Sequence, residues 1–313
     1  MKKAILFLVI VIALLAAVTV AIVYWPGQKM SNGKLPVTAS FYPLAEFARQ
    51  VGGYRVDVTT ITPAGAEPHD YEPSPQDIIA MRESKLFIYN GSGVELWADK
   101  EVPELRKAGV QTLNMSSQVT LRTVKEDNAG EPGQTGASMY DPHFWLDPVV
   151  AQDEVRAIAN LLSEVDPVDS SVFQSNAQQY IKKLQTLDAA YRESLASCTK
   201  HDIVTSHAAF GYLAHQYGLH QVSIAGFSPD AEPSPQQLAD VAKFAKAQGI
   251  TYIFFESLVS PKLSETIAQE IGAQTLVLNP LEGLSDSDIA AGQNYLTVMQ
   301  SNLVNLRAAL VCK

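Results

Sequence analysis

Three histidines in this 313-residue chain each lie in a turn that proline or glycine marks. His143 lies between two Asp-Pro pairs in the stretch DPHFWLDP, residues 141–148. His69 lies in GAEPHDYEP, and His207 lies in TSHAAFG. One such histidine is usually an ordinary surface residue, but imidazole nitrogen is also the commonest protein ligand for metal ions. Three histidines in such turns predict one metal site.

The elements around these histidines place them at the ends of predicted strands and helices. Alternating and β-branched segments predict strands over 55–62, 202–206 and 274–278, and the residues that follow them include His69, His207 and Glu282. His143 precedes a helix that begins at Pro148 and reaches about residue 164. In open α/β sheets, ligands bind beyond the carboxyl ends of the strands, so we expect these four side chains to meet there.

The ligand types favour zinc. Three imidazoles and one carboxylate form a four-coordinate shell that suits Zn²⁺, whereas Mg²⁺ and Ca²⁺ prefer oxygen and Mn²⁺ prefers more carboxylates. Glu282 is the candidate for the carboxylate. Five other acids are alternatives, or could orient the imidazoles instead: Glu67, Asp70, Glu72, Asp141 and Asp147.

Several nearby residues also have ordinary structural interpretations. Asp147 fits a helix cap equally well, and Phe144 and Trp145 pack beside the site or simply in the core. The remaining histidines lack a comparable setting, so we expect them to be surface or packing residues: His201, His215 and His220.

The order of strands and helices predicts an α/β fold with two lobes. Strands alternate with helices in both halves, which indicates mostly parallel sheets flanked by helices. A long helix with apolar residues spaced by three and four joins the halves. We expect a first lobe over 35–165, a rigid connecting helix over 166–197 and a second lobe over 198–313. Glu-Pro-Ser-Pro occurs at 72–75 and again at 232–235, which suggests related halves.

The N-terminus predicts export. Residues 4–25 are uncharged and almost wholly apolar and follow Lys2 and Lys3, as in a membrane anchor or a signal segment. With a linker over 26–34, an uncleaved segment over 1–25 would anchor an extracytoplasmic domain to the cell membrane; a cleaved one would leave it secreted or periplasmic. All 33 acidic side chains lie beyond residue 34, against 19 basic ones, so we expect no nucleic-acid partner.

The two cysteines suit the same compartment, because disulfides persist outside the cytoplasm. A bond between Cys198 and Cys312 would tie the start of the second lobe to the C-terminus. The alternative is two buried thiols.

Five stretches resemble the solute-binding proteins of zinc and manganese ABC importers, in the cluster A-I type, over about residues 35–312. They are residues 65–77, 141–148, 206–213, 254–263 and 278–284. The resemblance implies two α/β lobes joined by one rigid helix, with the metal between them. It also implies delivery of the ion to a membrane permease powered by a separate ATPase, with no chemistry on a substrate. We expect a monomer.

The resemblance assigns the metal ligands as His69, His143, His207 and Glu282. Zinc-type members have a third histidine where manganese-type members use a carboxylate, which favours zinc. Two features depart from the family pattern: residues 120–140 contain no histidine, and no cysteine for a lipid lies near the apolar segment. The alternatives are a manganese-binding member, a surface adhesin that contains zinc and a zinc hydrolase, for which no HExxH motif is present.

Overall fold

The structure is a computed structural model that describes residues 33–123 and 140–313. The predicted anchor or signal over 1–25, nearly all of the linker over 26–34 and most of the polar loop over 120–140 lie outside the described residues. Residues 35–313 form one compact unit. Within the two described ranges, no helix has both the length and the apolar character needed to cross a membrane.

The first sheet has four parallel strands in the order β2-β1-β3-β4. The strands are β1 (Leu35–Ala39), β2 (Val56–Thr60), β3 (Leu86–Tyr89) and β4 (Gln111–Asn114). The helices that alternate with them are α2 (Tyr42–Gly52), α3 (Pro75–Glu83) and α4 (Ala98–Lys107). His69 lies in the loop that joins β2 to α3.

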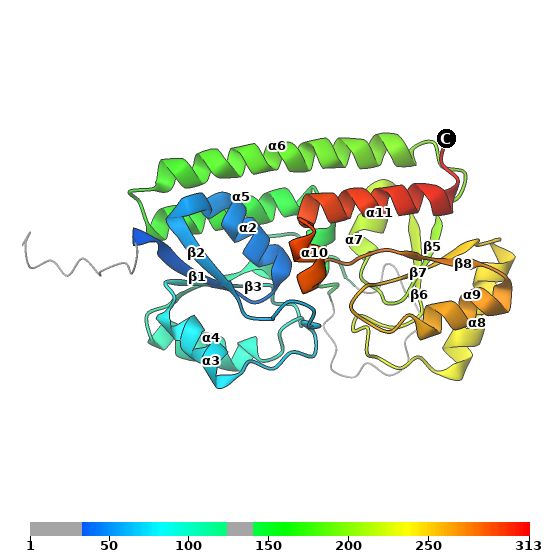
Figure 1. Ribbon diagram of the computed structural model, residues 1–313, viewed down its shortest axis with the longest axis horizontal. Helices are drawn as coiled ribbons and strands as arrows, with labels where there is room; N and C mark the ends of the chain where they lie inside the picture. Colours follow the sequence, from blue (N-terminus) through cyan, green and yellow to red (C-terminus); the bar gives the residue numbers. More distant parts are fainter. Residues whose placement is uncertain (1–32, 124–139) are drawn as a thin grey trace, which may run out of the picture. The chain divides into compact units, whose positions relative to one another are not determined.

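The second sheet repeats this arrangement in the order β6-β5-β7-β8, again parallel throughout. The strands are β5 (Asp202–Thr205), β6 (His220–Ser223), β7 (Tyr252–Phe255) and β8 (Gln274–Val277). The helices are α7 (Gly211–Tyr217), α8 (Pro235–Ala247) and α9 (Lys262–Ile271). Two parallel sheets flanked by helices confirm the predicted fold class (Figure 1).

The repeated Glu-Pro-Ser-Pro begins equivalent helices in the two halves. Ser74 caps α3 by accepting the N–H of Asp77 at 3.3 Å, and Ser234 caps α8 by accepting the N–H of Gln237 at 3.2 Å. Each serine is followed by a proline at the first helical position, where a missing N–H costs nothing. The repeat therefore marks the same step of the strand-to-helix connection in each sheet.

The helix α6 (Ser170–Leu195) packs against elements of both halves (Figure 1). The other helices on this side are α5 (Val150–Val165) and α11 (Tyr295–Leu310), and the short α10 (Asp286–Ala290) precedes α11. The predicted apolar stripe of α6 is buried throughout: Phe173, Ala177, Tyr180, Leu184, Leu187, Tyr191 and Leu195. It belongs to one continuous core that reaches both sheets. The proposed domain boundaries stay a prediction.

A disulfide joins Cys198, just after α6, to Cys312, just after α11. Backbone hydrogen bonds lie beside it, because the N–H groups of Thr199 and Lys200 both donate to the carbonyl of Leu310. The sulfur atoms are therefore paired as the exported setting suggests, and the alternative of two buried thiols is wrong.

Glu154 on α5 is fully buried, and neither of its carboxylate oxygens has a hydrogen-bond partner. Burial, with Asp153 and Asp147 nearby, raises the pKa of Glu154 well above the usual range of a glutamate. Because the folded pKa is the higher one, the stability that Glu154 contributes is fully present below the unfolded pKa. That stability is lost as the pH rises toward the folded pKa.

Glu154→Gln is therefore expected to stabilise the metal-free chain at pH 8 and to leave its stability nearly unchanged at pH 4. The gain should grow by about 1.4 kcal/mol for each pH unit above the unfolded pKa until the folded pKa is reached. Urea unfolding at the two pH values measures it. Glu164→Gln, an exposed position on the same helix, is the matched control. A variant that gains nothing at pH 8 would contradict the prediction.

Candidate metal centre

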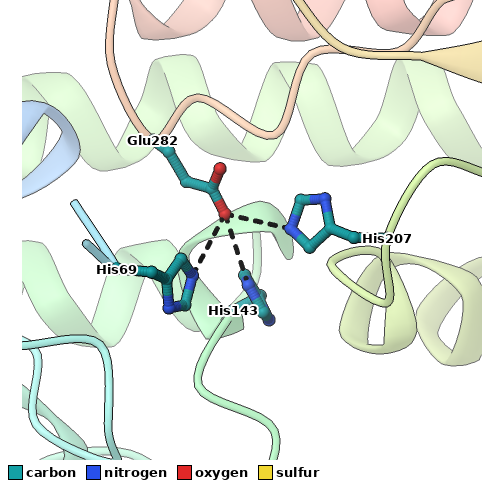
Figure 2. Close-up of side chains that lie close together, drawn as sticks. All are labelled: His69, His143, His207 and Glu282. Atoms are coloured by element: carbon teal, nitrogen blue, oxygen red, sulfur yellow. Dashed lines mark hydrogen bonds and ion pairs between the residues drawn. The ribbon is translucent and has the colours of Figure 1, made fainter. Parts of the chain in front are cut away.

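The four predicted ligand residues converge on one point (Figure 2). The Glu282 carboxylate oxygen Oε1 lies 3.1 Å from Nε2 of His207, 3.3 Å from Nε2 of His143 and 3.4 Å from Nε2 of His69. All four potential ligand atoms lie within 4.8 Å of one another. His143, His207 and Glu282 are buried, so the site is closed to solvent on most sides.

These spacings fit a tetrahedral ion. Zinc bonds to nitrogen and oxygen are about 2.0–2.2 Å long, and donors at the corners of such a tetrahedron lie roughly 3.3–3.6 Å apart. Of the three distances from Glu282 Oε1, those to His143 and His69, 3.3 and 3.4 Å, lie in that range, and the one to His207, 3.1 Å, lies just below it. The arrangement can therefore hold one small cation with four protein donors.

Unpartnered buried atoms also point to a cation. Nε2 of His69, Nε2 of His143 and Oε2 of Glu282 are buried, and none has a hydrogen-bond partner. A buried polar atom without a partner costs free energy, and an ion at the centre of the cluster would remove that cost for the two imidazole nitrogens.

His143 is held by the acid two residues before it. Asp141 Oδ1 accepts the backbone N–H of His143 at 2.9 Å and lies 2.8 Å from its ring Nδ1. With the proton on Nδ1, the other ring nitrogen keeps its lone pair and faces the site. Asp141 is thus an orienting acceptor, one of the two roles that the sequence left open for it.

His207 is held in the same way by Glu256, an acid that the sequence did not single out. Glu256 is the first residue after β7, and its Oε1 lies 2.7 Å from Nδ1 of His207. The Ser206 hydroxyl donates to the same oxygen. The signal was an acid directly after a buried strand, but its partner could be named only once β7 was known to pair with β5.

Glu282 projects from a constrained segment beyond β8. The preceding Leu281 has a φ of +59°, a left-handed conformation that costs free energy in a non-glycine residue. The side chain of Asn279 accepts the N–H of Leu281 at 2.7 Å, and the Trp145 indole donates to the carbonyl of Pro280 at 2.8 Å. These contacts fix the segment that aims Glu282 at the histidines, and they give Trp145 its place beside the site.

The charges in the site depend on one another. Burial opposes the ionised form of Glu282, but His207, His143 and His69 hold its pKa well below the usual range. Burial also opposes the charged form of His207, yet Glu256 and Glu282 raise its pKa well above the usual range. Asp141 and Glu282 likewise raise the pKa of His143 against burial. For His69 burial dominates, and its pKa is lowered.

The other predicted candidates are not among the four converging residues. Asp147 accepts the N–H of Val149 at 2.8 Å in the turn before α5, and this helix begins at Val150 rather than at the predicted Pro148, with Val149 as its N-cap. Asp70 lies beside Asp230, which raises the pKa of Asp70 to about 6, and Glu72 is exposed. Glu67 lies beside Glu282. His201, His215 and His220 are exposed, in agreement with their assignment as surface residues.

Comparison with known proteins decides the family. Residues 37–309 match the family model of ZnuA, described as the periplasmic component A of a zinc-uptake complex. The chain belongs to this family. That the four converging residues are its metal ligands stays a prediction, because none of these matches tests individual residues.

The names of two relatives also refer to zinc. The zinc-binding lipoprotein AdcA of Streptococcus pneumoniae is 42% identical over 284 residues, which cover 90% of this chain and 57% of AdcA. The high-affinity zinc uptake system protein ZnuA of Bacillus subtilis is 39% identical, over 92% of this chain and 91% of that protein. The chain thus spans little more than half of AdcA and nearly all of the Bacillus protein.

A solved structure of a zinc-bound domain is similar to this chain. The crystal structure of the Zn(II)-bound ZnuA-like domain of Streptococcus pneumoniae AdcA superimposes with a TM-score of 0.76 at 41% identity. The match covers 89% of this chain and 99% of that domain. The part of AdcA that this chain resembles is therefore a complete zinc-bound domain.

Glu256→Gln is expected to weaken Zn²⁺ binding about 10–100-fold, the range typical for loss of a group that orients a ligating histidine. The amide keeps the size of the side chain but removes the charge beside Nδ1 of His207. Competition with a chromogenic zinc chelator at pH 8 measures the affinity. Asp202→Asn is the matched control, because Asp202 makes a similar contact, of 2.8 Å, with Nδ1 of an exposed histidine, His220. Equal affinities for the two variants would contradict the role given to Glu256.

Proposed function

We propose that this protein is an extracytoplasmic zinc-binding protein that captures Zn²⁺ between two lobes and delivers it to the permease of an ABC importer with a separate ATPase. One observation carries the proposal: three imidazole nitrogens and one carboxylate oxygen lie within 4.8 Å of one another in a buried site, with the oxygen 3.1–3.4 Å from each nitrogen. The relatives, named a zinc-binding lipoprotein and a high-affinity zinc uptake system protein, support the same cargo.

The proposed ligands come from both halves of the fold. His69 and His143 follow elements of the first half, whereas His207 and Glu282 follow strands of the second. A buried ion held from both sides cannot leave while the lobes are together. Capture and release therefore require the first lobe (35–165) and the second lobe (198–313) to move apart. The connecting helix over 166–197, which contains α6, continues to join them.

The alternatives have less support. A catalytic zinc usually keeps three protein ligands and an open position for water, and four converging donors leave no such position. A manganese protein would be expected to offer more oxygen donors. For an adhesin, zinc would be structural, and its removal should unfold the chain. We further propose that the protein acts as a monomer, without catalysis, tethered to the membrane by its N-terminal segment.

Calorimetry of the purified, metal-free chain with Zn²⁺ and then with Mn²⁺ tests the proposal. The expected result is one Zn²⁺ per chain, bound much more tightly than Mn²⁺, in a protein that stays folded after the metal is removed. No tight site, or tighter binding of Mn²⁺, would overturn the zinc assignment. Unfolding on removal of the metal would favour a structural role instead.

A further inference from the structure

Glu67 is an acid at the metal centre to which the proposed function gives no role. It lies in the loop between β2 and α3, two residues before His69. Its Oε1 accepts the backbone N–H of His69 at 3.2 Å, while its Oε2 is buried without a hydrogen-bond partner. The same side chain lies beside the carboxylate of Glu282. Two buried carboxylates side by side repel each other unless a proton or a cation lies near them.

Backbone contacts hold the segments of Glu67 and Glu282 close together. The N–H of Gly65 donates to the carbonyl of Leu284 at 3.0 Å, which joins the chain just before Glu67 to the chain just after Glu282. A Cβ added to Gly283 would lie only 3.3 Å from the carbonyl oxygen of Ala66, so the two segments pack closely. Glu67 therefore reaches the position of Glu282 while belonging to the other half of the fold.

The proposed metal ligands are divided between the two halves, and this division gives Glu67 a role. When the lobes part, His207 and Glu282 move away from His69 and His143, and two imidazoles alone make a weak site. A carboxylate on the same side as these two histidines would complete a site of two histidines and one glutamate. Three protein ligands with an open fourth position form an established zinc arrangement, and the open position allows the ion to enter and leave.

The corresponding loop of the second half has no carboxylate at the position of Glu67. Glu67 precedes the glutamate of the first Glu-Pro-Ser-Pro by five residues, and Phe227 stands at the same place before the second. Phe227 lies against the site as an aromatic ring, 6.0 Å from the ring of His143. At this position of the two corresponding loops, only the first half therefore carries a donor group.

We infer that Glu67 is the carboxylate ligand of Zn²⁺ while the lobes are apart, and that Glu282 replaces it when they close. This inference rests on the proposed function. It makes the first half the capture site and the second half the element that seals it. The exchange needs only a small movement, because the two carboxylates already lie side by side in the closed structure.

The test compares Glu67→Gln in two backgrounds, with Zn²⁺ alone as the probe. In a His207→Ala, Glu282→Gln chain, which keeps only the first-half donors, Glu67→Gln should weaken binding at least tenfold, about the least that loss of an orienting partner costs. In the otherwise intact chain, the association rate measured by stopped-flow tryptophan fluorescence should fall about tenfold, while the equilibrium affinity changes less. Glu72→Gln, an exposed acid of the same loop, is the control.

The outcomes separate the two proposals. If the intact chain binds no Zn²⁺, the proposed function fails. If it binds Zn²⁺ tightly and Glu67→Gln behaves like Glu72→Gln, only the inference fails. An equal loss of equilibrium affinity in both backgrounds would also overturn it, because Glu67 would then act in the closed site too. Should the doubly substituted chain not fold, the association rate of the single variant decides.

Discussion

His143→Ala is expected to remove tight Zn²⁺ binding and to leave the chain folded. The His143 ring is fully buried, its Nε2 lies 3.3 Å from Glu282 Oε1, and it is the ligand nearest Trp145. Small structural zinc sites gain roughly 10–16 kcal/mol from four ligands, so one ligand is worth about 3–4 kcal/mol. That loss corresponds to a several-hundredfold weaker affinity, on the order of 10²–10³ in Kd.

Calorimetry of His143→Ala beside His220→Ala separates a ligand from an ordinary histidine. His220 lies in an exposed pair with Asp202, so its replacement should leave the affinity unchanged. Both metal-free variants should unfold cooperatively, which excludes misfolding as the cause of lost binding. A His143→Ala chain that binds Zn²⁺ as tightly as the unchanged chain would remove His143 from the ligand set.

The ligand candidates could be predicted because each is marked locally. A proline-bounded turn surrounds His69 and His143, and a strand of β-branched residues ends just before His207. Such signals depend on a few neighbouring residues, and the carboxyl ends of parallel strands lie at one edge of a sheet. The convergence of the four side chains therefore followed from local patterns and the fold class together.

The supporting contacts could not be predicted, because they depend on pairing between distant strands. Glu256 orients His207 only because β7 pairs with β5 rather than with the strand that precedes it in the chain. Glu67 meets Glu282 only because the loop after β2 packs against the segment after β8. Neither neighbour is visible in the local sequence, where both residues are simply acids in polar turns.

The ends of helices and strands are also hard to predict from the sequence, because they too depend on contacts between distant parts of the chain. The sequence predicts a connecting helix from residue 166, whereas α6 begins at Ser170, and an ion pair of 3.2 Å joins Arg55 to Asp169 just before it. A tertiary contact of this kind stabilises the turn before the helix. The apolar stripe of α6 was predicted residue by residue, because burial of one face imposes the helical period.

Acidification is expected to release Zn²⁺, and the directions of the pKa shifts give the pH window. In the metal-free chain the pKa values of His207 and His143 are raised, so both rings keep a proton to a higher pH than a free imidazole does. A ligating nitrogen cannot carry a proton, and Zn²⁺ must therefore displace these protons. His69 differs, because burial lowers its pKa and the ring stays neutral to a lower pH than a free imidazole does.

The direction of the pH dependence follows from this competition between protons and Zn²⁺. The affinity should rise with pH until both raised pKa values are passed, and it should fall by up to about two powers of ten per pH unit below them. Only below the pKa of His69 should the affinity fall by a further power of ten per pH unit. In the metal-free chain the two raised pKa values contribute stability that is fully present below the unfolded histidine pKa and is lost at higher pH. Stabilisation by Zn²⁺ should therefore shrink as the pH falls.

Chelator competition between pH 8 and pH 5.5 measures this dependence, and calorimetry in buffers of different ionisation enthalpy counts the protons released. Asp141→Asn provides the internal check, because it removes the carboxylate that contributes most to the raised pKa of His143. That variant should release up to one proton fewer per Zn²⁺ and show a shallower pH slope, even though its affinity is lower at pH 8. An affinity that stays constant across this range would mean that neither His143 nor His207 is a ligand, since a ligating imidazole must lose its proton before the metal can bind.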